Sequence, residues 1–433
     1  MADFIWQKGR ASVDERIMRF MAGEDVILDR ELFVYDLTAS RAHAEGLVHI
    51  GVLTTDEGQQ ISNALESLRV AFLNGEFELT DRFEDGHSAI EAYLTDVLGD
   101  TGKKIHAGRS RNDQVLVATR LFLRDRLDAL HHACWTCADT LLTRAEADPD
   151  TPMPGFTHLQ HAVVSSTGHW FAGYAEAFID NAALSADTRA WIDANPLGTA
   201  AGFGVNLPLD RTHTTKALGF SRTQINPMYA QNSRGKFELQ TLNALGQALL
   251  DVRRIAWDLS LFCTPEFDYI TLPDEHTTGS SIMPNKRNPD LIELLRASYG
   301  VVAGARNELE SLLSLPAGYH RDLQFTKAPL LRALRHGLDA MALMPDVISG
   351  ITFKAEHLRA RIEPEMFATD LAVQHAAAGT PFRDAYRSAL GAGDALADVT
   401  PEDSIAKRVS PGAPGQLQLD HLRQRLNAVR PNL

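Results

Sequence analysis

The sequence predicts an all-α protein, with three helical domains arranged around a central bundle of long helices. The first observation is the stretch from Arg109 to Asp148, which contains neither glycine nor proline. Within it, apolar residues recur at alternating steps of four and three, which is the spacing of one helix face and predicts a helix of about 30 residues. These apolar positions are Leu123, Leu127, Leu130, Cys134, Cys137 and Leu141.

Two later stretches repeat this spacing, and signals for β-strands are sparse throughout. A fourth long helix is expected from about Val163 to Ile192. Long helices with apolar residues at this spacing favour a bundle over a sandwich or a parallel sheet. The repeats are Leu242, Leu245, Leu249, Val252, Ala256 and Leu259 in one stretch, and Leu291, Leu295, Ser298, Val302, Ala305, Leu309 and Leu312 in the other.

The chain length, 433 residues, exceeds a single compact core, and we place domain boundaries near residues 105 and 350. Residues 1–105 contain shorter helical patterns such as Asp29–Ala44 and Thr55–Leu73, residues 106–350 hold the long helices, and residues 351–433 form a small helical domain broken by prolines. A thin bundle buries little surface per residue, so we expect the central helices to associate with other copies of the chain.

Composition and charge exclude several classes of protein. The formal net charge of −14 argues against a nucleic-acid partner. No apolar run is long enough to span a membrane, and the N-terminus lacks the apolar core of a signal peptide. Cys134 and Cys137 could form a redox pair, but their position deep inside a helical pattern favours packing. With Cys263 as the third cysteine, the sequence predicts a reduced, cytoplasmic protein.

The segment Gly279–Asp290 is the most informative in the chain. It places the Ser280 hydroxyl and the Lys286 ammonium just before a predicted helix start, with Asn288 as N-cap and Pro289 as the first helical residue. Hydroxyl, cation and helix N-terminus together suit an anionic substrate, whereas the alternative is a flexible linker before an ordinary helix. Glu293 would lie in the second turn, where it could orient a histidine or remain solvated.

The histidine candidate is His158, in the segment Met153–Gln160. Pro154-Gly155 predicts a turn, after which Thr157 and His158 would open the fourth long helix. The chain has 16 histidines, most of which are expected to be structural. A hydroxyl and an amide flank His158 at the predicted helix N-terminus, which favours it as a ligand-binding or catalytic group.

Two more segments carry polar groups suited to binding a substrate. Ala107–Val115 contains two arginines, whose forked guanidinium groups bind carboxylates well, although a solvated charged helix face would look the same. Gly318–Lys327 combines a phenol, an amide and an ammonium group in a turn after the third long helix. The sequence has no spacing typical of a metal site and no glycine-rich phosphate loop, so we predict acid–base chemistry without a metal or cofactor.

These four segments together resemble the fumarase/aspartase superfamily of lyases. Gly108–Val115, Gly155–Gln160 and Tyr319–Lys327 are similar to its argininosuccinate lyase branch, and the likeness extends over most of the chain. The resemblance implies a reversible β-elimination that splits L-argininosuccinate into L-arginine and fumarate, a step of arginine biosynthesis.

The resemblance also implies residue roles. Ser280 would remove the proton from the carbon beside a carboxylate, and Lys286 would stabilise the negative charge that develops. His158, polarised by Glu293, would assist departure of the leaving nitrogen. The division of acid and base roles between Ser280 and His158 stays open. Family members are homotetramers whose active sites combine three subunits. The implied substrate contacts are Arg111, Asn112, Thr157, Arg234, Asn288, Tyr319, Gln324, Lys327 and His87.

The chain departs from the family pattern at three places. Asp25 stands where many members have a serine, Gly235-Lys236 replaces an acidic residue after Arg234, and the C-terminal domain is shorter. The first two departures concern the non-succinyl half of the substrate. Two alternatives to argininosuccinate cleavage stay open. One is a sister enzyme that cleaves another N-succinyl compound, such as adenylosuccinate, and the other is an inert structural protein of the crystallin type.

Overall fold

The computed structural model describes residues 15–80 and 82–431 and confirms an all-α fold with a bundle of long helices. Its contacts divide the chain into two compact units, each assembled from three segments. The first unit contains the described residues up to Asp125, with Arg189–Gln240 and Ala305–Arg332. The second contains Arg126–Thr188, Thr241–Gly304 and the residues from Ala333 onward. The three-domain division at residues 105 and 350 stays a prediction.

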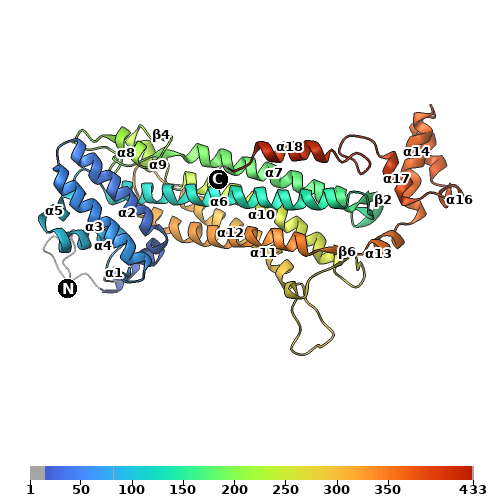
Figure 1. Cartoon of the computed structure of the whole chain (residues 1–433), viewed down its shortest axis with the longest axis horizontal. Helices are drawn as coiled ribbons and strands as arrows, with labels where there is room; N and C mark the ends of the chain where they lie inside the picture. The colour runs from blue at the N-terminus through green and yellow to red at the C-terminus, as the bar shows by residue number, and fades with distance from the viewer. Residues whose placement is uncertain (1–14, 81, 432–433) are drawn as a thin grey trace. The chain divides into compact units, whose positions relative to one another are not determined.

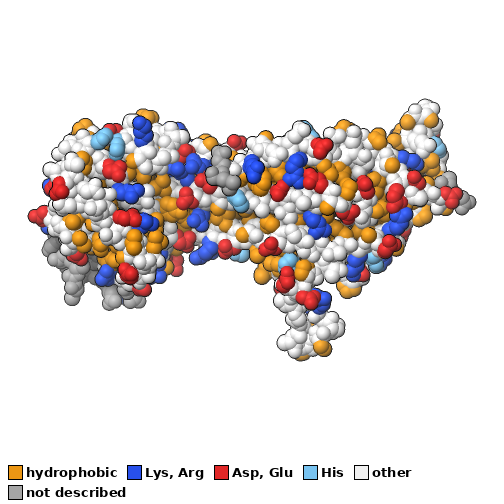
Figure 2. All heavy atoms as spheres, viewed as in Figure 1, with side chains coloured by type: hydrophobic (Ala, Val, Ile, Leu, Met, Phe, Trp, Pro, Cys, Tyr) orange, Lys and Arg blue, Asp and Glu red, His pale blue; other side chains and the backbone are white. Residues whose placement is uncertain are grey.

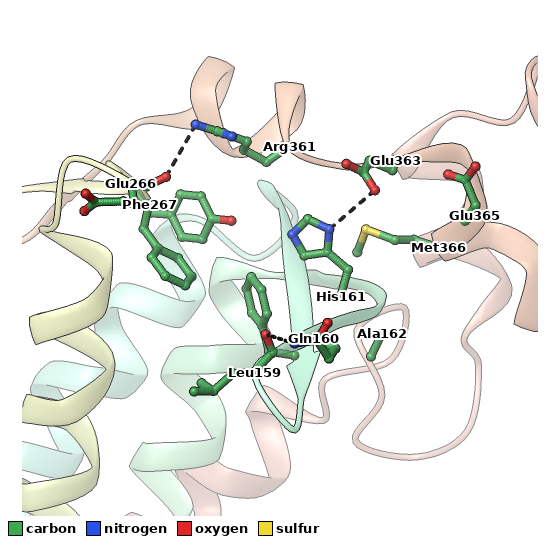
Figure 3. A pocket seen from close by; sticks show the side chains of 12 residues that line it. Leu159, Gln160, His161, Ala162, Glu266, Phe267, Arg361, Glu363, Glu365 and Met366 are labelled. Carbon is green, nitrogen blue, oxygen red and sulfur yellow. Dashed lines mark hydrogen bonds and ion pairs between the residues drawn. The ribbon is translucent and has the colours of Figure 1, made fainter.

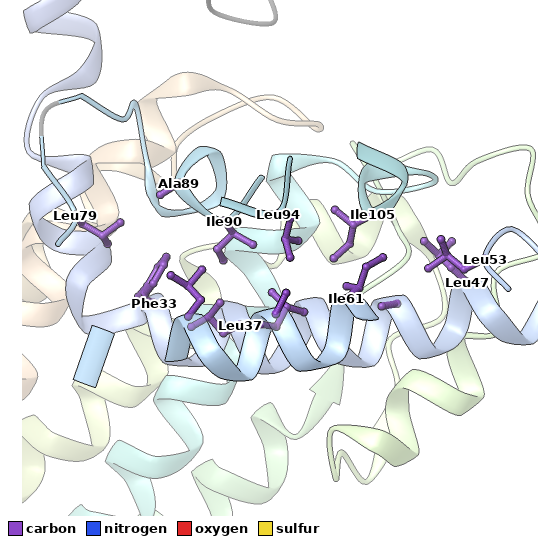
Figure 4. Close-up of a cluster of buried hydrophobic side chains, with 14 residues drawn as sticks. Phe33, Leu37, Leu47, Leu53, Ile61, Leu79, Ala89, Ile90, Leu94 and Ile105 are labelled. Carbon is purple, nitrogen blue, oxygen red and sulfur yellow. The ribbon is translucent and has the colours of Figure 1, made fainter. Parts of the chain in front are cut away.

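In the first unit, helices from the N-terminal part of the chain enclose a core of aliphatic and aromatic side chains. Figure 4 shows Phe33 and Leu37 facing Ile61, Ile90 and Leu94, all at most 2% exposed. The helices that lie wholly within this unit are α1 (Glu15–Ala22), α2 (Asp25–His49), α3 (Thr55–Leu73), α4 (Gly86–Leu98), α5 (Asp100–Lys103), α8 (Arg211–Ala217) and α9 (Pro227–Asn232). A short parallel pair, β3 (Ala194–Asn195) and β4 (Arg222–Thr223), completes this unit together with 3₁₀ turns at Lys104–His106 and Arg321–Thr326.

Local capping explains where these helices begin. At α3 the Thr54 hydroxyl accepts the Glu57 N–H at 3.2 Å, and the Glu57 carboxylate accepts the Thr54 N–H at 3.0 Å. Such a reciprocal pair satisfies two of the N–H groups that a helix start leaves without partners. Asp85 and Ser88 form the same arrangement at α4. The helix predicted at Thr55–Leu73 has these bounds, whereas α2 extends beyond the predicted Asp29–Ala44 at both ends.

The long helices confirm the predicted spacing. The six apolar positions of the first pattern lie in α6 and are at most 1% exposed, and the six of the second lie in α10 and are at most 2% exposed. Within the second unit, the Trp170 indole and the Tyr174 hydroxyl of α7 both donate to the Asp258 carboxylate of α10 at 2.8 Å. The long helices are α6 (Arg111–Ala147), α7 (Thr167–Ile192), α10 (Lys236–Phe262), α11 (Asp290–Leu312) and α12 (Lys327–Gly350).

Helix α12 is a fifth long helix that the sequence reasoning did not predict. It contains Pro345 in its interior and Gly337 at a close approach to α10, where an added Cβ would lie 2.6 Å from a Leu245 methyl carbon. Proline and glycine normally weaken a helix. Here burial of the helix against its neighbours outweighs that local cost, which is a tertiary effect that residue spacing does not report.

The predicted helix start at Thr157 and His158 is wrong. These residues lie at the end of an antiparallel hairpin of β1 (Pro152–Thr157) and β2 (Gln160–Ser166), and α7 begins only at Thr167. The β-branched Val163 and Val164 favour a strand over the first turns of a helix, and their strand pairs with Pro152–Thr157. Gly155 is required, because a Cβ there would lie 2.7 Å from the Val163 carbonyl oxygen.

The start of α11 also differs from the prediction. The helix begins at Asp290, so Pro289 precedes it and Glu293 lies in its first turn. Asn288, the predicted N-cap, exchanges two backbone hydrogen bonds with Thr278, at 2.7 and 2.9 Å. This bridge closes residues 279–287 into a loop, which Figure 1 shows extending away from the helices of its unit.

The C-terminal residues form short helices, as predicted. The last of them, α18, lies along α6, where Arg423 pairs with Asp139 and with Glu146 and the Trp135 indole donates to the Leu426 carbonyl at 3.1 Å. These helices are α13 (Ala355–Ala360), α14 (Ala368–Ala377), α15 (Phe382–Ala389), α16 (Gly393–Leu396), α17 (Pro401–Lys407) and α18 (Leu419–Ala428). The strands β5 (Ile270–Thr271) and β6 (Thr352–Phe353) pair nearby, and 3₁₀ turns lie at Asp274–His276 and Pro364–Phe367.

Acidic and basic side chains are interspersed on the face shown in Figure 2. Several large apolar side chains of the long helices are exposed as well, namely Trp257, Leu294, Val301 and Leu343. Among the described residues, none of the helices combines the length and hydropathy needed to cross a bilayer.

Candidate active site

Lys327 lies at the centre of a polar cluster in the first unit. Its ammonium is 2.7 Å from the nearer oxygen of Asp29 and 3.0 Å from that of Asp25, and we call these three residues the carboxylate–ammonium triad. Burial by itself would lower the pKa of Lys327, but the two carboxylates outweigh it and raise that pKa. Two carboxylates therefore hold Lys327 in its charged form.

The triad connects to the predicted contact His87 through the start of α4. The second oxygen of Asp29 accepts the Gly86 N–H at 2.8 Å. The next residue, His87, has its Nδ1 2.5 Å from the Asp36 carboxylate, and both side chains are buried. Burial would lower the pKa of His87, but Asp36 outweighs it and the pKa is raised. The opposite ring nitrogen, Nε2, is buried without a hydrogen-bond partner in the described residues.

Arg111, at the first position of α6, is held by two carboxylates. Its guanidinium donates to Glu84 at 2.8 Å and lies 3.2 Å from Asp85. Asn112 follows it, half-buried, with its backbone N–H donating to the Ser110 hydroxyl at 3.3 Å. The loop before α4 and the start of α6 thus present a carboxylate-bound guanidinium and an amide side by side.

The fully buried Asp113 organises this helix start, a role that the sequence reasoning missed. One of its oxygens accepts the Ser110 N–H at 2.9 Å, and the other accepts the N–H groups of Gly198 and Ala200 at 3.0 and 2.9 Å. These bonds tie the Ala107–Val115 segment to a loop about 85 residues further along. A self-capping Ser-x-x-Asp pattern was visible in the sequence, whereas the bonds to the later loop were not.

Arg234, Tyr319 and Gln324 complete the cluster. Arg234 is buried, donates to the Leu323 carbonyl at 3.2 Å and lies 5.7 Å from the centre of the Tyr319 ring. Gln324 donates to the Met21 carbonyl at 3.0 Å. At Gly235 the backbone favours glycine, since its φ is +82° and a Cβ there would lie 2.1 Å from a Leu313 methyl carbon.

His158 and Thr157 are exposed at the tip of the β1–β2 hairpin in the second unit. Thr157 pairs with Gln160, so His158 and Leu159 form a two-residue turn with φ values of 56° and 57°. Left-handed backbone at two consecutive non-glycine residues is strained, and strain of this kind concentrates at functional sites. The turn presents the His158 imidazole to solvent rather than to a helix N-terminus.

Ser280 and Lys286 lie in the loop closed by Thr278 and Asn288. The Ser280 hydroxyl oxygen accepts the backbone N–H groups of Met283 at 3.2 Å and Ile282 at 3.4 Å. Two such donors stabilise negative charge on the oxygen and so favour its deprotonated form. Lys286 is exposed on the same loop.

The predicted residues fall into separate groups, and their joint action stays a prediction. Within the second unit, none of the hydrogen bonds and ion pairs of the described residues joins His158 to Ser280 or Glu293. Glu293 instead lies 3.9 Å from Arg296 of its own helix. Seven predicted contacts belong to the first-unit cluster: His87, Arg111, Asn112, Arg234, Tyr319, Gln324 and Lys327.

A cavity of about 530 Å³ opens beside the hairpin, and Figure 3 shows its lining. Phe156, Phe267 and Tyr269 form an aromatic wall, and Glu363 lies 3.7 Å from His161. None of the predicted site residues lines it. Over residues 15–80 and 82–431, no group of three or more His, Cys, Asp or Glu side chains is placed to hold a metal ion.

The chain is similar in sequence to known lyases. A family model described as lyase matches residues 9–304. Argininosuccinate lyase of Stenotrophomonas maltophilia (strain R551-3) is 57% identical over 430 residues, covering 99% of this chain and 100% of the relative. Argininosuccinate lyase of Xylella fastidiosa (strain Temecula1) is 58% identical over 430 residues, covering 99% and 97%.

Solved structures show the same fold. An EDDS lyase in complex with formate superposes with a TM-score of 0.81 at 23% identity, covering 97% of this chain and 92% of the other. A class II fumarase from Schistosoma mansoni gives a TM-score of 0.74 at 16% identity, covering 89% and 94%. With the family match over more than half of its length and relatives at this identity, the chain belongs to the lyase family of the fumarase/aspartase superfamily.

Proposed function

We propose that this chain is an argininosuccinate lyase that splits L-argininosuccinate into L-arginine and fumarate. The observation that carries the proposal is the identity of 57–58% over 99% of the chain to relatives of that name. The first-unit cluster supports it, because paired cations and carboxylates suit a substrate half that bears both charges. The reaction is a β-elimination: a proton leaves the carbon beside a carboxylate, the C–N bond breaks, and the nitrogen gains a proton.

Ser280 is the proposed base. The N–H groups of Ile282 and Met283 at its oxygen lower the cost of forming the alkoxide, and Lys286 supplies a positive charge on the same loop. Abstraction of the proton puts extra negative charge on the neighbouring carboxyl group, which Lys286 and the start of α11 are suited to stabilise. His158, oriented by Glu293, would exchange a proton at the leaving nitrogen, either directly as an acid or through a water molecule.

We further propose that the active enzyme is a cytoplasmic homotetramer in which different subunits supply the groups of each site. Exposed apolar side chains on α10, α11 and α12, such as Trp257 and Leu294, support association through these helices. Exposure of His158 on a strained turn supports its insertion into a site formed with another copy. Asn288 and Thr157 would then join the first-unit contacts around the substrate.

Adenylosuccinate is the alternative substrate, and the paired cations argue against it. A phosphate group brings no cation of its own, so it would leave any carboxylate that it displaces from these cations without a counter-charge. In the described part of the first unit, Lys327 is held by two aspartates and Arg111 by Glu84 and Asp85. An inert crystallin-like protein is the other alternative, which an activity measurement excludes directly.

The test follows fumarate release by its ultraviolet absorbance with argininosuccinate and, separately, with adenylosuccinate. We expect a signal with the first substrate only. Ser280→Ala should lower kcat at least about 10²-fold, the low end for a positioned proton-transfer group, whereas Ser281→Ala on the same exposed loop should stay within about threefold of wild type. Turnover of adenylosuccinate alone would reject the assignment, and no turnover of either would favour the inert protein.

A further inference from the structure

The cavity beside the β1–β2 hairpin has a wall of three aromatic rings that contact one another. The ring centres of Phe267 and Tyr269 are 5.3 Å apart, and the centre of Phe156 lies 5.7 and 6.3 Å from them. The cavity volume of about 530 Å³ is within the range of small-molecule sites. All of the lining residues belong to the second unit, so the cavity is formed within one compact part of the chain.

Tyr269 brings a polar group to this wall. The residue is 2% exposed, and in the described part of the chain its hydroxyl makes no hydrogen bond. Buried tyrosine hydroxyls usually have a partner, because an unpaired one has lost its hydrogen bonds to water. Burial raises the pKa of the Tyr269 phenol, so the hydroxyl keeps its proton and remains a donor. Because Tyr269 lines the cavity, a molecule bound there can supply the missing acceptor.

Arg361 adds a positive charge to the same wall. Its guanidinium donates to the Glu266 carbonyl and to the His357 ring, both at 3.4 Å. Over residues 15–80 and 82–431, no carboxylate lies within ion-pair distance of this guanidinium. Its charge acts on Tyr269 and opposes part of the rise in that pKa. A guanidinium and a phenol hydroxyl that act together suit a carboxylate group of a ligand.

Acidic side chains line the remainder of the cavity. In Figure 3, His161 and Glu363 lie across from the Arg361 guanidinium. Glu363 is 3.7 Å from His161, whereas Glu266 and Glu365 have no ion pair within the described residues. With a neutral imidazole, the lining carries three negative charges and one positive charge, a net charge of −2. Such a lining attracts a cationic ligand, and the faces of the aromatic rings add to the attraction.

We propose that this cavity is a binding site for a cationic amino acid, separate from the proposed active site. The α-carboxylate of the ligand accepts hydrogen bonds from Arg361 and Tyr269, and its two cationic groups face the glutamates and the aromatic wall. Gln160 and His161 line the cavity as well, so the bound molecule contacts the hairpin that carries His158. The inference goes beyond the proposed function and does not depend on it.

Hydrogen exchange of backbone amides, followed by mass spectrometry, tests the site in the wild type. L-arginine is the probe, and residues 265–269 and 361–367 report on the cavity because they lie outside the proposed active site. At ten times its dissociation constant, L-arginine should slow their exchange about tenfold. L-glutamate, whose side chain has the opposite charge, should leave their exchange unchanged. Agmatine, which is arginine without its carboxylate, should require a concentration about tenfold higher.

Two variants test the carboxylate contacts. Arg361→Gln and Tyr269→Phe should each raise the L-arginine concentration for half of this protection by at least about tenfold, the factor for one hydrogen bond to a charged group. Arg359→Gln is the matched control, because Arg359 stands two residues earlier, pairs with Glu402 at 2.9 Å and does not line the cavity. It should leave the protection unchanged.

Protection by L-arginine that is confined to residues 156–162 of the hairpin would indicate binding at the proposed active site alone and would overturn the inference. Equal protection by L-glutamate, or an unchanged half-protection concentration in Arg361→Gln, would overturn it as well. The comparison of ligands on the wild type decides the question if a variant does not fold. Fumarate release tests the proposed function separately, and its absence leaves this inference standing.

Discussion

Buried or half-buried carboxylates hold three cationic side chains of the first-unit cluster in position. Asp36 fixes His87, Asp29 fixes Lys327, and Glu84 fixes Arg111, at distances between 2.5 and 2.8 Å. Each cation loses most of its hydration on folding, so its charge is maintained only because a carboxylate lies within contact distance. The geometry of this cluster is therefore set by ion pairs, and these pairs respond to pH.

The His87–Asp36 pair makes stability depend on pH in a definite direction. Because the pKa of His87 is raised in the folded state, the pair's contribution is complete below the unfolded value of about 6.5 and is lost as pH rises through the folded value. The free energy of unfolding, measured by urea denaturation, should thus fall between neutral and alkaline pH. In Asp36→Asn it should be lower by roughly 3 kcal/mol near pH 6 and this pH dependence should vanish. A wild-type curve that is flat above neutral pH would contradict this account.

The cations and hydroxyls of the site were predictable from the sequence, whereas the groups that hold them were not. Arg111, Lys327 and Ser280 each belong to a short motif of neighbouring residues, which is recognisable in the sequence itself. Their partners come from distant parts of the chain: Lys327 is 298 residues from Asp29, and Asp36 is 51 residues from His87. Spacing along the chain carries no information on such pairs, because only the packed helices bring them together.

Among the elements, the β1–β2 hairpin combines a required glycine, a bulge and a strained turn. The register shifts between Pro154 and Phe156, at Gly155, and the turn then places His158 and Leu159 in left-handed backbone. Leu159 is 68% exposed, so burial of its side chain does little to offset the strain. The hairpin is held by its neighbours rather than by its own turn residues.

Substitution at Leu159 should therefore change stability in opposite directions. Leu159→Gly should raise the free energy of unfolding by up to about 1 kcal/mol, because glycine adopts positive φ without strain. Leu159→Val should lower it by roughly the same amount, since a β-branched residue tolerates this conformation poorly. Urea denaturation of both variants measures the difference. Equal stability of the two would mean that the turn is not strained.

The long helices were predictable where their apolar spacing is regular and uninterrupted. The seam residues of α6 and α10 are buried as expected, because a helix face is defined by local geometry. The hairpin and α12 were not predictable in this way. The polar residues around His158 resemble those of a helix start although they lie in a hairpin. Pro345 argues against a helix from the sequence, but α12 continues through it because packing against its neighbours stabilises the helix.

For the whole molecule, the proposed tetramer makes a prediction that a single chain cannot satisfy. His158→Ala and Ser280→Ala subunits should each be inactive, but a mixture that exchanges subunits should regain activity, because some sites then combine an intact hairpin with an intact loop. Fumarate release, followed before and after the two variants are refolded together, measures the regained activity.

Light scattering on a sizing column should give four times the 47.6 kDa chain mass. A monomer with full activity would reject shared sites.

The segmented make-up of the first unit has a consequence during synthesis on the ribosome. Asp25 and Asp29 emerge early, but Lys327, which neutralises both, lies in the last segment of that unit, Ala305–Arg332. Until most of the chain has been translated, the nascent N-terminal helices carry two carboxylates whose counter-charge has not yet been made. The first unit can therefore complete its folding only late in translation, and a chain that ends before Lys327 cannot form the carboxylate–ammonium triad.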